Sequence, residues 1–362
     1  MVTTTWPYYF APAQADAERI ATGFREPLGA GANLTDDASI RDRVAALGRA
    51  GLLVSLGVGP VRSVAVTRAA LAYRDPLDDL AFIIQELGAT PLARAGAEPA
   101  LLAEARAGRC VLAFALTEPD AGSDVRNVRT RAVPHGDHWV LQGAKWFISN
   151  APEADHAVVF ARQPDGVVGC FLVDHPEATP QRVAGHSIGR FDFRGAPARL
   201  VSPRGLPLAL GTLERCRPTV GLAAFGLARR AFVETVRHVR HREQFGAPLA
   251  ALPVVQHRVA EMAVELETLA LPALHACWCR DTADPSQRTG YEAAVGKVVA
   301  TEAAGRMIDL AVQLHGALGV EEDHPIQALA RAVRPLRIYE GATDVLMSII
   351  GGRWVASTTG AP

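Results

Sequence analysis

The hydrophobic period of this chain changes twice, and the order of the changes limits the folds that it can adopt. Apolar residues first recur at helical spacing, in the segments 40–51, 63–73, 76–88 and 99–107. From residue 111 to about 205 the apolar runs are short and β-rich, and from residue 206 the helical period returns. The sequence therefore predicts a helical domain over 1–110, a β-domain over 111–205 and a helical bundle over 206–362.

The middle segment has the pattern of a small antiparallel sheet. Its apolar runs lie at 111–116, 138–141, 157–160 and 167–173. A spacing of roughly ten residues favours hairpins, because a parallel crossover usually needs a helix between its strands. We therefore expect an antiparallel, barrel-like middle domain. By contrast, residues 1–38 contain scattered prolines and no periodic pattern, so we expect them to be irregular.

Composition argues against several classes of function. The 362 residues are 49% hydrophobic, which is enough for large cores, and the net charge is -1. Because so small a charge attracts neither nucleic acid nor an anionic membrane, we expect neither as a partner. No apolar run reaches membrane-spanning length, and the five cysteines are scattered. We expect a soluble, cytoplasmic protein with reduced thiols and no metal site.

A single carboxylate lies between two helical segments near the end of the chain. Apolar residues recur at helical spacing over 325–336 and again over 345–350, where Thr343 is a typical capping residue. Glu340 falls in the break, and Gly341 allows the backbone to turn there. Apolar neighbours would raise the pKa of this carboxyl toward a range useful for proton abstraction. Glu340 is therefore a candidate base; alternatively, it is only an acidic residue near a helix N-terminus.

Five short motifs lie along the chain: 116–124 (LTEPDAGSD), 143–150 (GAKWFISN), 242–249 (REQFGAPL), 313–319 (QLHGALG) and 338–341 (IYEG). In this order they resemble motifs of the acyl-CoA dehydrogenase family of flavoproteins. The resemblance implies the domain order predicted above, with a four-helix bundle as the last domain. It also implies that FAD binds between the last two domains and that the protein dehydrogenates an acyl thioester.

The resemblance implies cofactor contacts from the middle domain. Thr117 matches the position at the pyrimidine edge of the flavin, and Gly122 and Ser123 match the turn near the pyrophosphate. Phe147 stands where the family usually has a tryptophan against the isoalloxazine, and Ser149 where a hydroxyl points at flavin N5. The expected cofactor-binding set also includes Phe114, Leu116 and Asp344.

Other positions resemble those that reach the FAD of a neighbouring subunit. Arg242 matches an arginine that meets the pyrophosphate of that FAD, and the other expected contacts are Phe245, Gln313 and Gly316. The resemblance therefore implies a homodimer or homotetramer with a shared cofactor. We expect His315 to serve packing, because a lone histidine on an apolar helix is more often core than ligand.

The resemblance gives Glu340 the role of base. It would remove the α-proton of an acyl thioester while the β-hydride passes to flavin N5. Arg217 matches an arginine near the base, and Glu214 stands where many relatives have an aspartate near the pantetheine. The expected substrate set also includes Tyr339 and Gly341. An electron acceptor such as an electron-transfer flavoprotein would complete the reaction.

Departures from the family pattern leave other functions open. Pro253, Ala317 and Ala342 stand where the family commonly has Gln, Gly and Thr, and the segment 201–206 is shorter than the usual linker. These changes would suit an acyl group that arrives on a carrier protein instead of CoA. A flavin monooxygenase or oxidase on the same fold is a second alternative, against which Glu340 argues. A non-catalytic member retained for interaction is a third.

Overall fold

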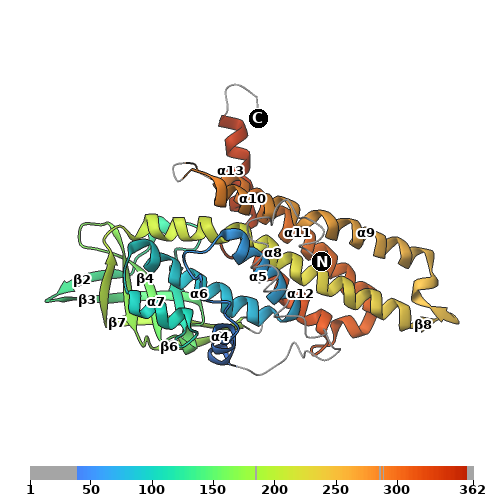
Figure 1. The fold of residues 1–362 in the computed structure, drawn as a ribbon, viewed down its shortest axis with the longest axis horizontal. Coiled ribbons are helices and arrows are strands. Elements are labelled where there is room, and N and C mark those ends of the chain that lie inside the picture. Colours follow the sequence, from blue (N-terminus) through green and yellow to red (C-terminus); the bar gives the residue numbers. More distant parts are fainter. Residues whose placement is uncertain (1–38, 184–185, 285–286, 288, 357–362) are drawn as a thin grey trace. The chain divides into compact units, whose positions relative to one another are not determined.

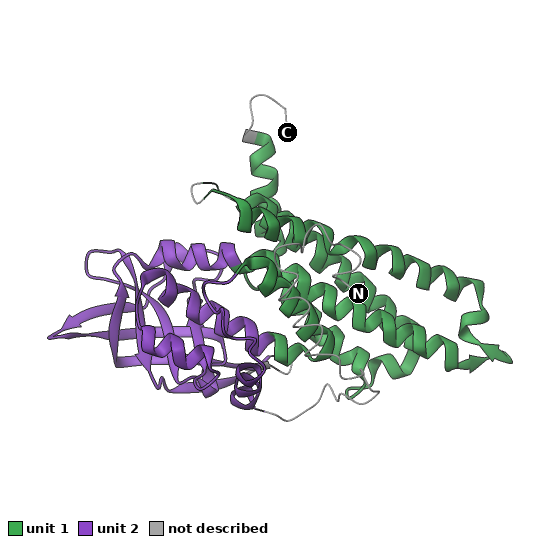
Figure 2. Ribbon diagram, viewed as in Figure 1, with its two compact units in different colours: residues 1–36, 60–79, 216–362 green, residues 37–59, 80–215 purple. Residues whose placement is uncertain are grey.

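The computed structural model describes residues 39–183, 186–284, 287 and 289–356 (Figure 1). These residues form two compact units, which Figure 2 distinguishes by colour. Unit 1 contains residues 60–79 and the described residues from 216 onward, and unit 2 contains the described residues up to 59 together with 80–215. The three-domain boundaries stay a prediction, and the irregular segment expected over 1–38 lies outside the described residues.

The predicted N-terminal helices are present. They are α4 (Ile40–Arg49), α5 (Val61–Arg74), α6 (Pro76–Ala95) and α7 (Pro99–Arg106). The prediction ended the third of these at Gly88, but α6 continues beyond it. The glycine serves close packing instead, because a Cβ at position 88 would lie 2.7 Å from the Cβ of Leu112.

Unit 2 contains a seven-stranded sheet. Its strands are β1 (Leu112–Ala115), β2 (Arg131–His135), β3 (His138–Ser149), β4 (His156–Arg162), β5 (Val168–Asp174), β6 (Ala178–Val183) and β7 (His186–Ser202). The pairing runs from β4 through β2, β3, β7 and β5 and returns to β4, which closes a ring. The barrel-like prediction is therefore confirmed.

The sheet is not wholly antiparallel, and this corrects the prediction. β4 pairs in parallel with β1 and, at one residue pair, with β2. In each case other strands of the barrel form the connection, so no crossover helix is needed. Phe171 and Phe191 are fully buried in the core of the barrel.

Most of the remaining helices form the predicted bundle, together with a short hairpin that follows α8. The bundle helices are α8 (Gly205–His241), α9 (Pro253–Leu269), α10 (Leu271–Thr282), α11 (Gly290–His315) and α12 (Pro325–Leu336), and the hairpin strands are β8 (Glu243–Gln244) and β9 (Ala247–Pro248). The last helix, α13 (Thr343–Ala356), contacts α11 and contributes none of its described residues to the bundle core. Small residues bring the helix axes close: a Cβ at Gly221 on α8 would lie 2.5 Å from the Cβ of Ala273 on α10. The predicted apolar stripe of α8 contributes Leu222 and Phe225 to this core.

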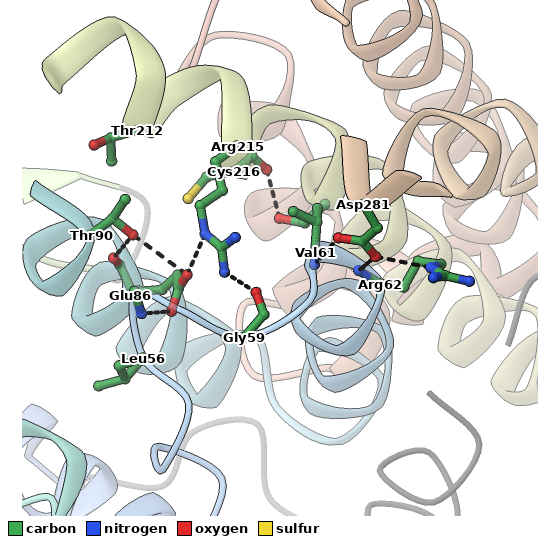
Figure 3. A network of polar contacts seen from close by, with 12 residues as sticks. Leu56, Gly59, Val61, Arg62, Glu86, Thr90, Thr212, Arg215, Cys216 and Asp281 are labelled. Atoms are coloured by element: carbon green, nitrogen blue, oxygen red, sulfur yellow. Dashed lines mark hydrogen bonds and ion pairs between the residues drawn. The ribbon is translucent and has the colours of Figure 1, made fainter. Parts of the chain in front are cut away.

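Buried carboxylates hold helices and loops within each unit (Figure 3). In unit 1, Asp281 accepts the backbone N–H groups of Val61 and Arg62 at 2.6 and 3.1 Å, and so satisfies donors in the first turn of α5. In unit 2, Glu86 accepts Nε of Arg215 and the N–H of Gly57, each at 2.9 Å.

The described residues contain neither a membrane-spanning helix nor a metal-binding cluster. No helix among them is long and apolar enough to cross a membrane. No group of three or more His, Cys, Asp or Glu side chains in the same residues is placed to hold a metal ion.

Candidate functional site

Glu340 lies in the turn between α12 and α13, as the sequence predicts. Its backbone φ is 53°, a value that few residues other than glycine adopt, and φ of Gly341 is 108°. A Cβ at position 341 would lie 2.9 Å from Cδ2 of Leu346. Glycine is therefore needed at 341 both for its backbone angle and for the space it leaves.

The carboxylate of Glu340 has the environment expected of a base. The residue is half-buried, but its Oε2 atom is buried and has no hydrogen-bond partner among the described residues. Burial raises the pKa of Glu340, and the nearby cations Arg68 and Lys297 oppose that rise without cancelling it. A buried carboxylate oxygen without a donor is able to accept a proton.

The backbone around Glu340 is held by cationic side chains from two helices. Arg217 on α8 donates from Nε to the carbonyl oxygen of Glu340 at 2.8 Å. Lys297 on α11 donates from Nζ to the carbonyl oxygens of Tyr339 and Gly341. The structure thus brings together Arg217, Tyr339, Glu340 and Gly341, as the sequence predicts, and adds a lysine that was not predicted.

Glu302 on α11 closes the same turn. It accepts Nε of Arg337 at 2.8 Å and the hydroxyl of Thr343 at 2.9 Å. The N–H of Thr343 in turn donates to the carbonyl oxygen of Arg337 at 3.1 Å. The two ends of the turn are therefore tied to each other and to α11.

A buried ion pair lies close enough to influence the Glu340 carboxyl. Arg68 on α5 is fully buried and donates Nε and Nη2 to the two carboxylate oxygens of Asp79 at 2.8 and 2.9 Å. Its Nη1 donates to the hydroxyl of Thr219 at 3.1 Å. Burial also raises the pKa of the Tyr339 phenol, which therefore stays protonated at neutral pH.

In unit 2, a β-bulge displays the aromatic residues of the second motif. Lys145 pairs with Phe191 and Ile148 with Gly189, so β3 has one extra residue between these pairs. Phe147 lies in the bulge with φ 55° and remains 55% exposed. The N–H of Trp146 donates to the carbonyl oxygen of Thr117 at 2.9 Å. The bulge therefore lies beside Thr117.

A buried ion pair fixes the segment around Thr117. Lys145 donates from Nζ to Oε1 of Glu118 at 2.7 Å and to the carbonyl oxygen of Leu116 at 3.0 Å. Glu118 also accepts the N–H groups of Arg129 and Thr130 at 2.5 and 3.0 Å. Lys145 therefore binds both neighbours of Thr117 in the chain, Leu116 and Glu118.

The other predicted cofactor residues of unit 2 differ in exposure. Leu116 is buried, and Phe114, Thr117 and Ser149 are half-buried. Gly122 and Ser123 are exposed, and the space beyond Gly122 is open. Together with Phe147, this set offers an exposed ring, two hydroxyls and an open polar turn.

The residues predicted to reach a second subunit lie near the ends of α8 and α11. Arg242, Phe245, Gln313 and Gly316 are all exposed, and Phe245 is 93% exposed. The two helix ends meet where the rings of His238 and His315 stack at 4.3 Å. His315 is buried, and burial lowers its pKa to about 4, so it is a neutral packing residue, as expected.

Two predicted residues stand apart from these groups. Asp344 is exposed in the first turn of α13, and in the described part of the chain it does not join the hydrogen bonds of the Glu340 turn. Glu214 is half-buried on α8, in unit 2. Their predicted cofactor and substrate roles stay predictions.

Sequence reasoning missed four charged residues: Glu118, Lys145, Lys297 and Glu302. One signal was available, because the chain has 37 lysines and arginines and only Lys145 and Lys297 are lysines. Both lysines are buried, and both bind backbone carbonyl groups beside predicted site residues.

Comparison with known proteins agrees with these features. The middle domain of the acyl-CoA dehydrogenases matches residues 113–196, and the C-terminal domain matches residues 203–355. The 3-(aryl)acrylate reductase of Clostridium sporogenes is 32% identical over 266 residues, which is 67% of this chain and 68% of that protein. The human mitochondrial short-chain specific acyl-CoA dehydrogenase is 34% identical over 263 residues. That match covers 67% of this chain and 63% of the human enzyme, just under two thirds of its length.

A solved structure shows the same fold over nearly the whole chain. The glutaryl-CoA dehydrogenase of Mycobacterium smegmatis superposes with a TM-score of 0.85, covering 96% of this chain and 95% of that one. Its sequence identity is 24%, so the likeness concerns the fold. The two domain matches and the curated relatives establish that this chain belongs to the acyl-CoA dehydrogenase family.

Proposed function

We propose that this protein is an FAD-dependent dehydrogenase of acyl thioesters in which Glu340 is the catalytic base. The observation that supports this most directly is the buried Oε2 atom of Glu340, which has no hydrogen-bond donor in the described chain. The turn that carries it is held by Arg217 and Glu302, so the carboxylate has a fixed position. A flavin monooxygenase, which forms no α,β double bond, would not need such a base.

The residues of unit 2 fit FAD. An isoalloxazine needs a flat apolar surface and polar groups at its edge, and Phe147 with the hydroxyls of Thr117 and Ser149 offers both. Gly122 and Ser123 offer an open turn for the pyrophosphate, since a turn without a bulky side chain lets phosphate oxygens approach the backbone. When bound, FAD would supply the acceptor for the hydride that leaves the β-carbon.

Glu340 would perform the proton transfer. The α-hydrogen of an acyl thioester is weakly acidic, and its proton passes to the Glu340 carboxylate as the α,β double bond forms. The raised pKa makes the Glu340 carboxylate a stronger base toward that weakly acidic proton. The backbone N–H of Glu340 would donate to the thioester oxygen as negative charge develops there. The product is an enoyl thioester.

We propose further that two copies of the chain share the cofactor. Arg242, Gln313 and Gly316 are exposed at adjoining helix ends, and Phe245 beside them is almost fully exposed. Met347 and Ile349 on α13 are also about half exposed, at 52% and 47%. Exposed apolar side chains of this kind are typical of an interface, and a second copy of the chain related by two-fold symmetry would bury them.

Arg242→Ala is expected to lower flavin retention and to weaken assembly together. The substitution removes an exposed guanidinium that would bind the pyrophosphate of the neighbouring subunit, so both effects share one cause. Bound flavin and mass by light scattering would be measured over a dilution series, with the exposed Arg258→Ala as the control. Full flavin occupancy and unchanged mass in Arg242→Ala would contradict the shared site.

The proposed reaction is tested by anaerobic reduction of the flavin. Purified protein would be mixed with acyl-CoA thioesters of different lengths, and separately with the same acyl groups on a carrier protein. Loss of flavin absorbance with formation of the enoyl thioester is expected in at least one arm, and the productive arm identifies the carrier. An electron-transfer flavoprotein would be added as the proposed acceptor. A flavin that no acyl thioester reduces, but that reacts with NAD(P)H and O₂, would favour the monooxygenase alternative.

A further inference from the structure

Lys297 has an unusual position for a lysine. It lies on α11, its side chain is almost fully buried at 1% exposure, and Nζ donates to two carbonyl oxygens. Those oxygens belong to Tyr339 and Gly341, the residues on either side of Glu340. Burial of an ammonium costs free energy unless strong acceptors replace its water. Here the acceptors are the backbone of the base turn itself.

The base turn needs such an anchor. A non-glycine residue with φ near 53° has a strained backbone, which persists only where its surroundings impose it. Lys297 fixes the carbonyl groups before and after Glu340, and Arg217 fixes the carbonyl of Glu340 itself at 2.8 Å. Three successive carbonyl groups are therefore bound by cations from α11 and α8. The Oε2 atom of the Glu340 side chain, by contrast, has no hydrogen-bond partner among the described residues.

The choice of lysine fits this geometry. An ammonium is compact and has three donors, whereas a guanidinium is planar and larger. The Lys297 side chain is almost fully buried, so little room remains around its ammonium group. In a chain so rich in arginine, a buried lysine at this position indicates that the compact cation fits the site better than arginine does.

We infer that Lys297 is a positioning residue for proton abstraction: it holds the backbone on both sides of Glu340 and places a positive charge near the carboxylate. The inference rests on the proposed role of Glu340 as base. The charged groups that face the carboxylate are Arg68 on α5, Asp79 on α6, Arg217 on α8 and Lys297 on α11, with the Tyr339 phenol beside them. Burial lowers the pKa of Lys297 to about 8, so the side chain remains mostly charged at neutral pH.

Lys297→Met tests both parts of this role. Loss of the tether should lower kcat by roughly 100-fold, since a displacement of about 1 Å has an effect of that size, while KM changes little. Loss of the positive charge disfavours ionised Glu340, which raises its pKa. The acid limb of the kcat/KM profile should therefore move to higher pH. Lys297→Arg keeps a charged donor, so its acid limb should stay at the wild-type pH and part of kcat should return.

Three controls make the result interpretable. Arg306→Met removes an exposed cation from the same helix and should leave kcat and the acid limb unchanged. Glu340→Gln reports on the proposed function separately: activity in that variant would refute the base, whereas an inactive Glu340→Gln beside a normal Lys297→Met would refute only the inference. If Lys297→Met does not fold, Lys297→Gln keeps two N–H donors without the charge, and the same shift of the acid limb is expected.

Wild-type kcat and an unmoved acid limb in Lys297→Met would overturn the inference. So would a Lys297→Arg variant that matches Lys297→Met in both quantities. In either case the lysine would only fill space in the bundle.

Discussion

Glu340→Gln is expected to lower kcat by roughly 10²- to 10⁴-fold, the range that general acid–base catalysis contributes. The amide has nearly the shape of the carboxylate but cannot accept the α-proton. The loss should appear equally in kcat and kcat/KM, because the base acts only in the transition state. Rapid-mixing measurement of flavin reduction by an acyl thioester would give both constants.

The same substitution should not weaken the fold. Burial raises the pKa of Glu340, so the folded state favours the protonated carboxyl, and that contribution to stability is lost as pH rises through the folded-state pKa. Above the unfolded-state pKa the wild-type protein therefore has a cost of burying this titrating carboxyl that neutral glutamine does not have. The free energy of unfolding of Glu340→Gln should equal or exceed that of the wild type.

An exposed glutamate supplies the control. Glu321→Gln makes the same chemical change at an exposed site after α11 and should leave both kcat and stability unchanged. Wild-type flavin reduction in Glu340→Gln would exclude Glu340 as the base. A fall in activity accompanied by loss of bound flavin would also count against it, since the proposed defect lies in proton transfer alone.

The turn that holds Glu340 could be predicted because its signals are local. The period of 325–336 matches α12 at both ends, and Thr343 does begin α13. Gly341 is needed where the sequence places it. Such features depend on residues a few positions apart, so one sequence is enough to find them.

The longest strand could not be predicted, because most of its pairing is with β3 and β5, which are not adjacent to it in the sequence. β7 covers 17 residues and pairs with β3, β5 and β6. Its alternation is interrupted where the register shifts at Leu141 and Gln142 of β3, opposite Gly195 with φ 97°. A strand paired along its length with three partners needs neither a clean alternating pattern nor strong β-formers throughout.

The anchors of the site were missed for a related reason. Lys297 binds carbonyl groups 42 and 44 residues away, and Lys145 binds a carboxylate 27 residues away. Every residue has a backbone carbonyl, so the residue that accepts such a hydrogen bond cannot be recognised from the sequence. The rarity of lysine was visible in the sequence, but only the fold reveals that both lysines are buried beside the site.

Lys145→Met is expected to destabilise unit 2 by about 3–5 kcal/mol, the cost of leaving one partner of a buried ion pair uncompensated. Both side chains are buried, and Nζ lies 2.7 Å from Oε1 of Glu118. Burial raises the pKa of the Glu118 carboxyl, but Lys145 and the backbone donors outweigh it, so the net pKa is lowered. Burial lowers the pKa of Lys145 to about 8, so the pair is ionised at neutral pH.

The exposed pair between Arg109 and Glu104 provides the control. Arg109→Met should leave the free energy of unfolding almost unchanged, because solvent screens surface pairs. Chemical denaturation of the holoprotein, monitored by far-UV circular dichroism, would compare the two variants. Equal and small losses would show that the Lys145–Glu118 pair contributes little.

A double variant separates the charge from the hydrogen bonds. Glu118 also accepts the N–H groups of Arg129 and Thr130, and glutamine retains a carbonyl oxygen for them. Lys145→Met combined with Glu118→Gln removes both charges but keeps an acceptor, so it should be more stable than Lys145→Met alone.

Flavin retention in the double variant should not recover to the same extent as stability. Lys145 also binds the carbonyl of Leu116, and without that bond the segment around Thr117 is held less firmly against the bulge of β3. If stability recovers and flavin affinity does not, the ion pair stabilises the fold and the Leu116 contact supports the cofactor site. A double variant no more stable than Lys145→Met would contradict the explanation by an uncompensated buried charge.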